Sequence, residues 1–500
     1  MNSSPKNRPR WRRWLKRTFL GGGIFFLVVA LATLRPVDHG PWAQTESAVH
    51  ARADAATMQR ELAAAHPAPL EAGWAAAPLD LRIGEPMAGY GARRGAASVG
   101  VEDPLYARAL CVRAGGAEVV LVTADVLLVH AGVAREVIRL CGAQGIEEKA
   151  IYFAATHTHC GPGGWGPNVI EQAVCGKFDA QAVQRLARVL ASVIIAARAA
   201  AKPAEWIWLE MAAPEHVRNR TVKSGPTDPS FDALAVRHLD DGATGVFAIY
   251  GAHATCHGSR TMQFSADYPG ALVRHLEGGG LAFAAFGAGA MGSQSPVGPG
   301  DGARRAEQIS ASLARRVLSG VRSATWKREV TLATARREFP LPPMQVRLGR
   351  QVRLAQWLAG TLHAPAAPFH LLRFDNHWMA GLPVEFSAML SAPLRAEAGQ
   401  SGTHLCVTAF NGDYLGYVLP PALYDSDAYE AGMDFLGPWG GEYFADLIRA
   451  GIWLDRAGNP KEAVPGQMMS ARRSVRLARL RQRRSLGAAA DRSLVLRGIV

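Results

Sequence analysis

The stretch VVLVTADVLLVHAGVAREVIRLCGAQGIEEKAIYFAATHTH, Val119–His159, indicates the fold class of this protein. It opens with an apolar run of strand length, Val119–Val129, and closes with another, Ala150–His159. Between them, Val133–Gly145 places apolar residues at helical spacing and stops at a glycine. A strand, a helix and a second strand in succession are typical of an α/β protein.

Outside this stretch the same mixture of elements recurs along the chain. No internal repeat and no Ser- or Pro-rich linker interrupts it, so we predict one large domain over residues 75–465. Its fold class is α/β, with mixed β-sheets surrounded by helices. Further strands are expected at Trp206–Ala212, Gly245–His253, Leu281–Gly289 and Cys406–Phe410, and further helices at Ala180–Ala201 and Ala306–Val321.

Positive charge is concentrated at the two ends of the chain. The formal net charge is +13, and residues 1–18 contribute seven cations and no acid. Residues 471–500 hold nine arginines and one aspartate, so the residues between the two ends sum to −2. A near-neutral body lacks the broad basic surface of a phosphate-backbone binder, and we expect no nucleic-acid partner.

An uncharged apolar run, Phe19–Leu34, follows the basic N-terminus. It is short for a full membrane span but long for an ordinary buried helix, and the cations before it favour membrane targeting. The positive-inside rule leaves the N-terminus in the cytoplasm and puts the body in the periplasm or the cell exterior. Ala30–Ala32 resembles a cleavage site, yet the run is longer than most cleaved ones. We therefore predict an uncleaved, single-pass transmembrane signal-anchor over residues 1–38.

Two further segments flank the predicted domain. Residues 39–74 are Ala-rich, and we expect a spacer with a helix around Met58–Ala65. Residues 466–500 form a basic tail, which is typical either of an amphipathic helix on a membrane surface or of a disordered cationic segment. The six cysteines are scattered and form no CxxC pair, so neither a disulfide scaffold nor a zinc ribbon is indicated.

A glycine-rich stretch, GAGAMG at Gly287–Gly292, formally matches the dinucleotide-binding pattern G-x-G-x-x-G. That pattern needs a helix at its third glycine so that the pyrophosphate meets a helix N-terminus. Here SQSPVGPGDG follows, with two prolines and more glycine. We expect no nucleotide cofactor. GSQSPVG is not a nucleophile elbow either, because a proline replaces the second glycine.

Histidines stand where two apolar runs end. His157 and His159 lie two apart, and in an extended chain both rings would point to one side, as a metal or an anionic transition state requires. His253 ends a second such run, and Glu385 follows a Gly-Leu-Pro turn, where it could also be a simple helix-terminal carboxylate. Two imidazoles and a carboxylate are the ligand set of a catalytic zinc with one open position. A further strand-end loop offers Tyr414 and Tyr417.

Several blocks of sequence together resemble one family. ATHTHCGPGG, Ala155–Gly164, resembles the SHTHSGPGG-type signature of the neutral, non-lysosomal ceramidases. The blocks occur in the family's order from about Leu79 to Phe444, which is more specific than any single motif. The others are VRNRTVKSGPTDP around Arg220, GAHATCHG around His253, MGSQSPVG around Ser295, LPVEFSAM around Glu385, and GYVLPPALYDSDAYEAGMDFLGP, which contains Tyr417 and Tyr429.

The resemblance implies a zinc site and roles for its neighbours. It implies that His159 and Arg220 face the scissile group and that Tyr429 lines the site. Ser295, in its Gly-rich turn, is expected to position substrate, and a serine that only caps the turn is the alternative. Of the two histidines in the HTH motif, only the first is implied as a ligand. The implied zinc ligands are His157, His253, Glu385 and Tyr417.

The chain also departs from the family's pattern. The resemblance does not extend to the immunoglobulin-like domain that neutral ceramidases generally append, and the Asp usual before Ser-Pro is absent from GSQSP. The serines after the two zinc histidines are replaced by Cys160 and Cys256, each three residues beyond an implied ligand. If both histidines hold one zinc, the two loops converge. A disulfide between the cysteines is then one hypothesis, and two independent buried thiols are the other.

These observations predict a membrane-anchored, zinc-dependent amidohydrolase that cleaves an N-acylated, ceramide-like lipid into a fatty acid and a sphingoid base or other amine. Its expected partners are that lipid substrate and the membrane. Two alternatives remain: a zinc hydrolase acting on a different amide or ester, and a catalytically inactive lipid-binding relative. A metallo-β-lactamase-type site would need HxHxDH, whereas Gly161 and Pro162 occupy that region. An amidohydrolase barrel would carry its HxH on the first strand.

Overall fold

A mixed nine-stranded sheet, with the strand order β12-β10-β9-β7-β2-β4-β5-β6 and β14 paired to β2, lies at the centre of the structure. The structure is a computed structural model, and it describes residues 10–40 and 42–452. The pairs β10–β12 and β5–β6 are parallel and the other pairs are antiparallel. The strands are β2 (Ala68–Pro78), β4 (Tyr106–Ala114), β5 (Ala117–Ala124), β6 (Ile151–Phe153), β7 (Lys202–Ala212), β9 (Ser230–His238), β10 (Thr244–Tyr250), β12 (Phe283–Ala288) and β14 (Glu329–Val330).

A four-stranded sheet, in the order β15-β17-β18-β20, packs on one face of the large sheet. One buried apolar cluster joins the two sheets, with Trp206 and Phe247 from the large sheet against Phe374 and Met379 from the small one. The four strands are β15 (Leu332–Pro340), β17 (Ala366–Phe374), β18 (His377–Gly381) and β20 (His404–Thr408).

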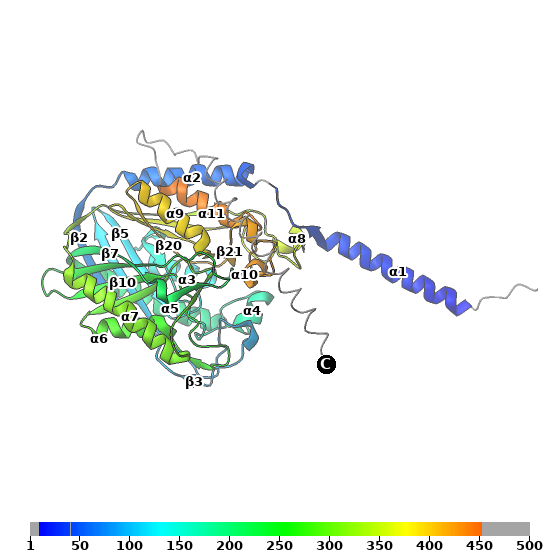
Figure 1. The fold of residues 1–500 in the computed structure, drawn as a ribbon, viewed down its shortest axis with the longest axis horizontal. Helices are drawn as coiled ribbons and strands as arrows, with labels where there is room; N and C mark the ends of the chain where they lie inside the picture. Colours follow the sequence, from blue (N-terminus) through cyan, green and yellow to red (C-terminus); the bar gives the residue numbers. More distant parts are fainter. Residues whose placement is uncertain (1–9, 41, 453–500) are drawn as a thin grey trace, which may run out of the picture. The chain divides into compact units, whose positions relative to one another are not determined.

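Helices cover the outer faces of both sheets (Figure 1). The free face of the large sheet packs against two helix pairs, through clusters rich in Val, Leu, Ile and Ala. These helices are α3 (Ala131–Gly142), α5 (Ala180–Ala199), α6 (Asp267–Gly278) and α7 (Gly302–Ser323). The small sheet is covered by α2 (Glu46–Ala63), α9 (Ala388–Gln400) and α11 (Gly440–Ile452). The order of layers is therefore helix, sheet, sheet, helix.

Shorter elements lie in the segments that connect these layers. Four two-stranded ribbons, four short or separate α-helices and five three-residue 3₁₀ helices complete the described part of the chain. The ribbons are β1 (Leu34–Pro36) with β16 (Val352–Leu354), β3 (Gly100–Val101) with β11 (Gln263–Phe264), β8 (Val217–Asn219) with β13 (Gln294–Pro296), and β19 (Glu385–Phe386) with β21 (Tyr417–Val418). The α-helices are α1 (Arg10–Thr33), α4 (Val169–Cys175), α8 (Gln356–Ala359) and α10 (Tyr429–Gly432).

The predicted α/β class with mixed sheets is confirmed, and the strands and helices expected from the apolar runs are present. The runs overestimate the C-terminal ends of three strands, because β5 ends at Ala124, β6 at Phe153 and β10 at Tyr250. Beyond these points the chain enters the loops that build the site described below. As expected, no helix opens at the third glycine of GAGAMG, since β13 is the next element.

The segment expected to be a spacer, residues 39–74, is packed into the body. Helix α2 contacts α11 and β15 and buries Ala51, Met58 and Leu62. Strand β2 begins at Ala68 and occupies the middle of the large sheet. The described residues up to Ile452 form one compact unit. The predicted tail, 466–500, and the last residues of the predicted domain lie outside the described residues.

The apolar N-terminal run forms the second half of α1, and its large side chains are exposed, for example Phe19 and Phe26. By length and composition, the helix in the described residues that qualifies as a membrane span is α5, whereas Thr18–Thr33 is a shorter apolar helix. The buried side chains of α5, such as Leu190 and Ile194, pack on the large sheet. Helix α5 is therefore a core helix, and α1 remains the predicted anchor.

Candidate metal and hydrolytic site

The HTH motif lies in the loop that follows β6. The chain leaves regular structure after Phe153, and His157 has a left-handed backbone with φ of 59°. The expectation that an extended chain aligns the two rings is therefore wrong, because it is a turn that brings His157 Nε2 and His159 Nε2 to 3.1 Å. A non-glycine residue with positive φ is strained, and such strain often marks functional sites. Phe410 stacks on the His157 ring at 4.4 Å.

His253 meets this loop through a backbone bridge. Thr158 and Ala254 form an isolated parallel bridge, so the residues that precede them, His157 and His253, lie side by side. Their ring centroids are 4.9 Å apart. The Nδ1–H of His157 donates to the carbonyl of Leu127 at 2.7 Å, and that of His253 donates to the carbonyl of Gln294 at 2.8 Å. These bonds orient both rings and leave each Nε2 facing the cluster.

The carboxylate and the phenol come from a second pair of segments. Strands β19 and β21 are parallel, and their register pairs Glu385 directly with Tyr417. Glu385 Oε2 lies 2.8 Å from His253 Nε2 and 3.7 Å from His157 Nε2. The Tyr417 hydroxyl lies 3.2 Å from His253 Nε2. The structure thus brings together the four residues predicted to be metal ligands: His157, His253, Glu385 and Tyr417.

The donor set fits a divalent metal such as zinc. One ligand nitrogen from each of His157, His159 and His253 lies within 4.8 Å of the others. Glu385 Oε2 is buried and has no hydrogen-bond partner among the described residues. A buried carboxylate oxygen without a partner is costly, and a cation among these nitrogens would remove that cost. Imidazole and carboxylate groups around one open position are typical of catalytic zinc sites.

The electrostatics of the site favour neutral imidazoles. Burial lowers the pKa of His157 to about 3, although Glu385 alone would raise it. Burial also lowers the pKa of His159 and His253 well below the usual value. Neutral imidazole is the form that binds metals, so these histidines are ready as ligands at neutral pH. Burial raises the pKa of the Tyr417 hydroxyl, and the charge of Glu385 raises it further.

Arg220 stands beside the cluster in the loop after β8. Its Nη2 donates to the Tyr417 hydroxyl at 2.9 Å, and its Nε donates to Glu430 Oε1 at 2.6 Å. Burial by itself would lower the Arg220 pKa, but Tyr417, Glu385 and Glu430 outweigh it and raise that pKa. The guanidinium is therefore charged, and the Glu430 carboxylate holds it in place.

The other predicted site residues differ in their placement. Tyr429 lies at the rim, 65% exposed, with its ring 5.8 Å from that of Tyr417. Ser295 lies in β13, where its hydroxyl accepts a hydrogen bond from Arg218 at 3.2 Å, and it is not among the residues that line the pocket beside the cluster. A positioning role for Ser295 stays a prediction.

Sequence reasoning did not assign three neighbours of the site. The Tyr414 hydroxyl donates to Glu385 Oε1 at 2.9 Å, and Glu430 holds Arg220. Gly89 has a φ of 113°, and a Cβ there would come within 2.6 Å of the His159 Cα. Glu430 lies within a block that resembles the family, and Tyr414 lies two residues before that block, in the strand-end loop that also holds Tyr417; these signals could have found both residues. No local pattern marks Gly89.

A pocket of about 110 Å³ opens beside the cluster. Its walls come from loops and short elements that lie far apart in the sequence, and apolar side chains dominate them. A mostly apolar pocket with a few convergent polar groups is the usual form of a small-molecule site. The apolar lining includes Leu127, Trp165, Ile170, Val174, Met344, Val346, Leu362, Leu415, Met433 and Phe435.

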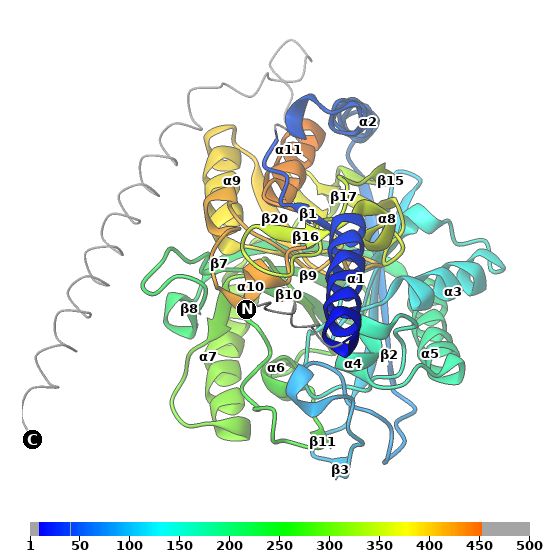
Figure 2. The same ribbon diagram turned by 90° about the vertical axis from the view of Figure 1, so that its right-hand side faces the viewer.

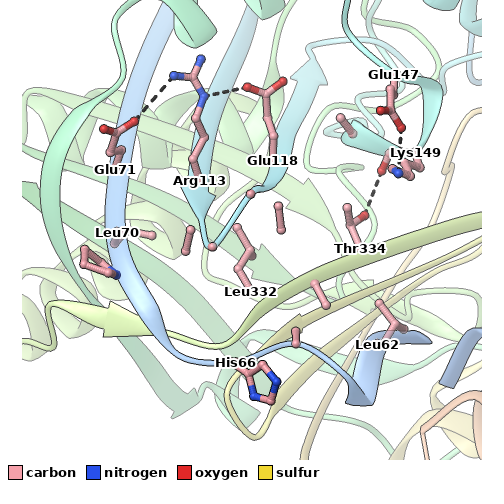
Figure 3. Close-up of a pocket in the computed structure, with 18 of the residues that line it drawn as sticks. Leu62, His66, Leu70, Glu71, Arg113, Glu118, Glu147, Lys149, Leu332 and Thr334 are labelled. Atoms are coloured by element: carbon pink, nitrogen blue, oxygen red, sulfur yellow. Dashed lines mark hydrogen bonds and ion pairs between the residues drawn. The ribbon is translucent and has the colours of Figure 1, made fainter. Parts of the chain in front are cut away.

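A larger hollow of about 880 Å³ lies elsewhere, between the end of α2, β2 and the β4–β5 turn (Figure 3). Its charged side chains pair with one another. Arg113 lies 2.6 Å from Glu118 and 3.7 Å from Glu71, and Lys149 lies 2.8 Å from Glu147. With its charges compensated in this way, the hollow shows no ligand set comparable to the histidine cluster, despite its greater size.

Cys160 and Cys256 are free thiols, so the disulfide hypothesis is wrong for this structure. The Cys160 Sγ accepts a hydrogen bond from Arg93 at 3.3 Å. Burial raises the pKa of the Cys256 thiol, and the neighbouring carboxylate of Asp267 raises it further. Each cysteine therefore has its own partner, which matches the alternative of two independent buried thiols.

This chain is similar to known proteins both in sequence and in fold. Residues 82–281 match the family described as neutral/alkaline non-lysosomal ceramidase, N-terminal, whereas no curated protein matches. The fold matches a neutral ceramidase from Pseudomonas aeruginosa with a TM-score of 0.67 and 20% identity, over 79% of this chain and 76% of that chain. A ceramidase complexed with C2 matches with a TM-score of 0.68 and 18% identity, over the same shares. The predicted resemblance to this family is confirmed.

Proposed function

Since the chain is a relative of the neutral/alkaline ceramidases, we propose that it is a zinc-dependent hydrolase of an N-acylated, ceramide-like lipid. The reaction splits the amide bond and releases a fatty acid and a sphingoid base or other amine. The observation that carries this proposal is the meeting of His157, His253, Glu385 and Tyr417 at the edge of an apolar pocket. Polar chemistry and an apolar wall lie next to each other, as an amide with a long acyl chain requires.

The four ligand residues would hold the zinc ion. When bound, zinc polarises a carbonyl oxygen and lowers the pKa of water at its open position toward neutrality. The backbone carbonyls of Leu127 and Gln294 keep His157 and His253 in the tautomer that offers Nε2. The Tyr414 hydroxyl holds the carboxylate of Glu385 by donating a hydrogen bond to Oε1, the oxygen that does not face the histidines.

Two further groups would act on the scissile amide. His159 lies beside the ligands, with its Nε2 3.1 Å from that of His157, and Arg220 carries a full charge. Both can donate hydrogen bonds to the oxyanion that develops as the carbonyl is attacked. One such donor in a pocket that excludes water is typically worth about 3 to 4 kcal/mol of barrier. Tyr429 at the rim would contact the substrate as it enters.

The apolar lining would hold the acyl chain. Trp165, Met344 and Phe435 contribute large apolar surfaces to the pocket. Each buried CH₂ group of a ligand contributes about 0.8 kcal/mol, so chain length would affect binding strongly. One similar structure is a ceramidase complexed with C2, and by that likeness we assign the pocket of this chain to a lipid amide.

The placement of the enzyme follows from its N-terminus. We assign α1 to the membrane as an uncleaved signal-anchor, with the body in the periplasm or the cell exterior. The exposed apolar side chains along α1, among them Leu20, Phe25 and Leu31, support this assignment. The enzyme would then share a membrane with its substrate.

The test combines metal analysis with fatty-acid release from an N-acyl sphingoid base. His253→Ala and Glu385→Gln should lose bound zinc and activity together. His159→Ala should keep zinc and lower kcat about 10²- to 10³-fold, because a donor to the oxyanion is not a ligand. Equal loss of zinc in His159→Ala would show that His159 is a ligand. The test is sharp because His159 lies within the nitrogen cluster.

Two outcomes would contradict the proposal. Zinc binding with turnover of another amide or ester, and none of the ceramide, would indicate a different hydrolase. Ceramide binding without turnover in the zinc-loaded protein would indicate an inactive lipid-binding relative. Ser295→Ala serves as the variant outside the ligand cluster, and its zinc content should equal that of the unaltered protein.

A further inference from the structure

The end of the apolar helix α1 is joined to a wall of the pocket. Strand β1, which follows α1 without a break, pairs antiparallel with β16, in the order Leu34 with Leu354 and Pro36 with Val352. Ala355 donates its N–H to the carbonyl of Thr33, the last residue of α1. The Trp357 indole donates to the carbonyl of Ala32 at 3.0 Å. The segment around β16 is therefore held at the point where α1 ends.

The same segment lines the pocket. Met344, Val346 and Leu362 face the pocket, and they cluster with Leu354 of β16. The N–H of Leu354 donates to the carbonyl of Val346 at 2.9 Å. A continuous path of contacts thus runs from the pocket wall to β16, to β1 and to the end of α1.

Large apolar side chains are exposed around this path and at the pocket rim. Leu348 is 59% exposed, Trp357 61% and Val169 82%. Helices α4, α8 and α10 and strand β16 lie at the same end of the body, on the right in Figure 1 and toward the viewer in Figure 2. We call these side chains the mouth face: Val169, Ile170, Leu348, Val352, Trp357 and Tyr429.

Two cations lie opposite each other within this face. Arg35 of β1 and Arg353 of β16 are directly paired in the ribbon, and neither makes an ion pair within the described part of the chain. Arg35 Nη1 donates to the carbonyl of Leu34 at 2.7 Å, and Arg353 Nε donates to that of Pro36 at 3.0 Å. Like charges directly opposite in a ribbon destabilise it unless an anion lies between them. Lipid phosphates supply that charge at a membrane surface.

We propose that the mouth face docks on the lipid bilayer, so that the pocket opens toward the membrane and a lipid amide enters it without crossing bulk water. A bilayer accounts for each of these observations. The apolar side chains would enter its edge, Trp357 would lie at the level of the headgroups, and Arg35 and Arg353 would contact lipid phosphates. This inference rests on the proposed function for the identity of the substrate. The docking itself rests on the geometry of the mouth face.

The direct test measures depth in the full-length protein, one chain per lipid nanodisc, with a spin label at Leu348→Cys or Val169→Cys. The six native thiols are buried. The control is Leu239→Cys, which is 43% exposed and lies at the turn before β10, the end of that strand remote from His253. Lipid-soluble oxygen should relax the two mouth-face labels more than a water-soluble nickel complex does, and the control should show the reverse.

Equal access of the nickel complex to all three labels would overturn the proposal. Protection of Leu348 or Val169 only in discs that hold two chains would also overturn it, because the face would then be a contact between copies. Neither measurement requires turnover. Labels that insert into lipid in an inactive protein would uphold the docking and contradict only the proposed function.

A kinetic test examines the consequence for substrate entry. Val169→Asp and Leu348→Asp should lower turnover of a long-chain ceramide in vesicles about tenfold or more, since a carboxylate resists entry into lipid. The same variants should keep turnover of a water-soluble short-chain ceramide within about twofold of the unaltered protein, and Leu239→Asp should change neither rate. An equal loss with both substrates would contradict entry from the bilayer.

Discussion

The side chain of Tyr414 holds the proposed ligand Glu385 from outside the histidine cluster. Its hydroxyl donates to Oε1 at 2.9 Å, while Oε2 faces His253 and His157. Burial raises the pKa of Tyr414 well above its usual value, and the charge of Glu385 raises it further, so the phenol stays a donor. Tyr414 is thus a positioning residue that acts through the carboxylate.

Replacing Tyr414 with phenylalanine tests this role. Tyr414→Phe keeps the buried ring but removes the bond to Oε1, and the zinc dissociation constant should rise about 10- to 100-fold. Competition with a chelator of known affinity measures it. Tyr152→Phe is the matched control, because it loses a buried hydroxyl bond to Thr408 (2.6 Å) and should leave zinc affinity unchanged. Equal affinities in both variants would contradict the role of Tyr414.

Single residues differ in how far sequence could assign them. The histidines of the HTH motif and His253 are visible because imidazoles at the ends of apolar runs are unusual. The reason for their convergence is not visible, since it depends on the left-handed backbone of His157 and the Thr158–Ala254 bridge. The backbone carbonyl of Leu127 carries no sequence signal at all.

At the scale of single helices and strands, helix α5 shows that composition alone does not determine where an element lies. Its composition alone would allow a membrane span, yet it packs on the large sheet. The contact is close at Gly73 of β2, which is buried beneath the C-terminal end of the helix. A Cβ on Gly73 would come within 2.5 Å of the Ala197 carbonyl oxygen and 2.4 Å of the Ala201 nitrogen. Backbone lies against backbone there, so no side chain can move aside.

The variant Gly73→Ala should therefore destabilise the protein by about 1 to 3 kcal/mol. Thermal unfolding of the full-length protein in detergent micelles, followed by near-ultraviolet circular dichroism, measures the loss. Gly142→Ala is the control, since Gly142 ends helix α3 with open space around it, and alanine there should be neutral or stabilise by up to about 1 kcal/mol. Matching melting curves for the two variants would contradict the packing of α5 on β2.

Strands also differ in whether a local sequence pattern predicts them. The apolar runs predicted β7, β10, β12 and β20, because buried strands need continuous apolar residues. Two-residue strands such as β19 and β21 have no such pattern. Their pairing, which sets Glu385 beside Tyr417, depends on the packing of segments that lie far apart in the sequence.

At the scale of the whole molecule, the N-terminus serves both the proposed anchor and the body. Residues 34–36 pair with β16, Val37 is buried, and Asp38 exchanges backbone hydrogen bonds with the Gln345 side chain. The anchor predicted over residues 1–38 therefore includes a part that belongs to the fold. The boundary between the two functions lies at about Thr33.

Two truncations separate these functions. Loss of residues 1–33 should release the protein from membranes and lower its Tm only slightly, because of the contacts with the body it loses just the hydrogen bonds from Ala355 to Thr33 and from Trp357 to Ala32. Loss of residues 1–38 should release it as well, but lower its Tm by a few degrees, because burial of Val37 and several hydrogen bonds worth about 1 kcal/mol each are lost. Sedimentation with anionic vesicles and thermal unfolding are the two measurements. Continued sedimentation of the shorter chains would assign membrane binding to the mouth face or to the basic tail.

The sequence by itself determined the α/β class, the order of the main elements, the apolar N-terminal helix and the identity of the candidate ligands. Most of these features reside in local periodicity and in a few chemically distinctive residues, whereas the choice of His157 and Tyr417 as ligands came from the resemblance to the family. Only the tertiary structure decided that His159 lies among the ligand nitrogens, that Tyr414 and Glu430 support the site, and that residues 39–74 belong to the body. It alone joined the end of α1 to the pocket through β1 and β16. The pairing of β1 with β16 joins Leu34 to Leu354, which lie 320 residues apart, and such long-range contacts depend on the packing of the whole core.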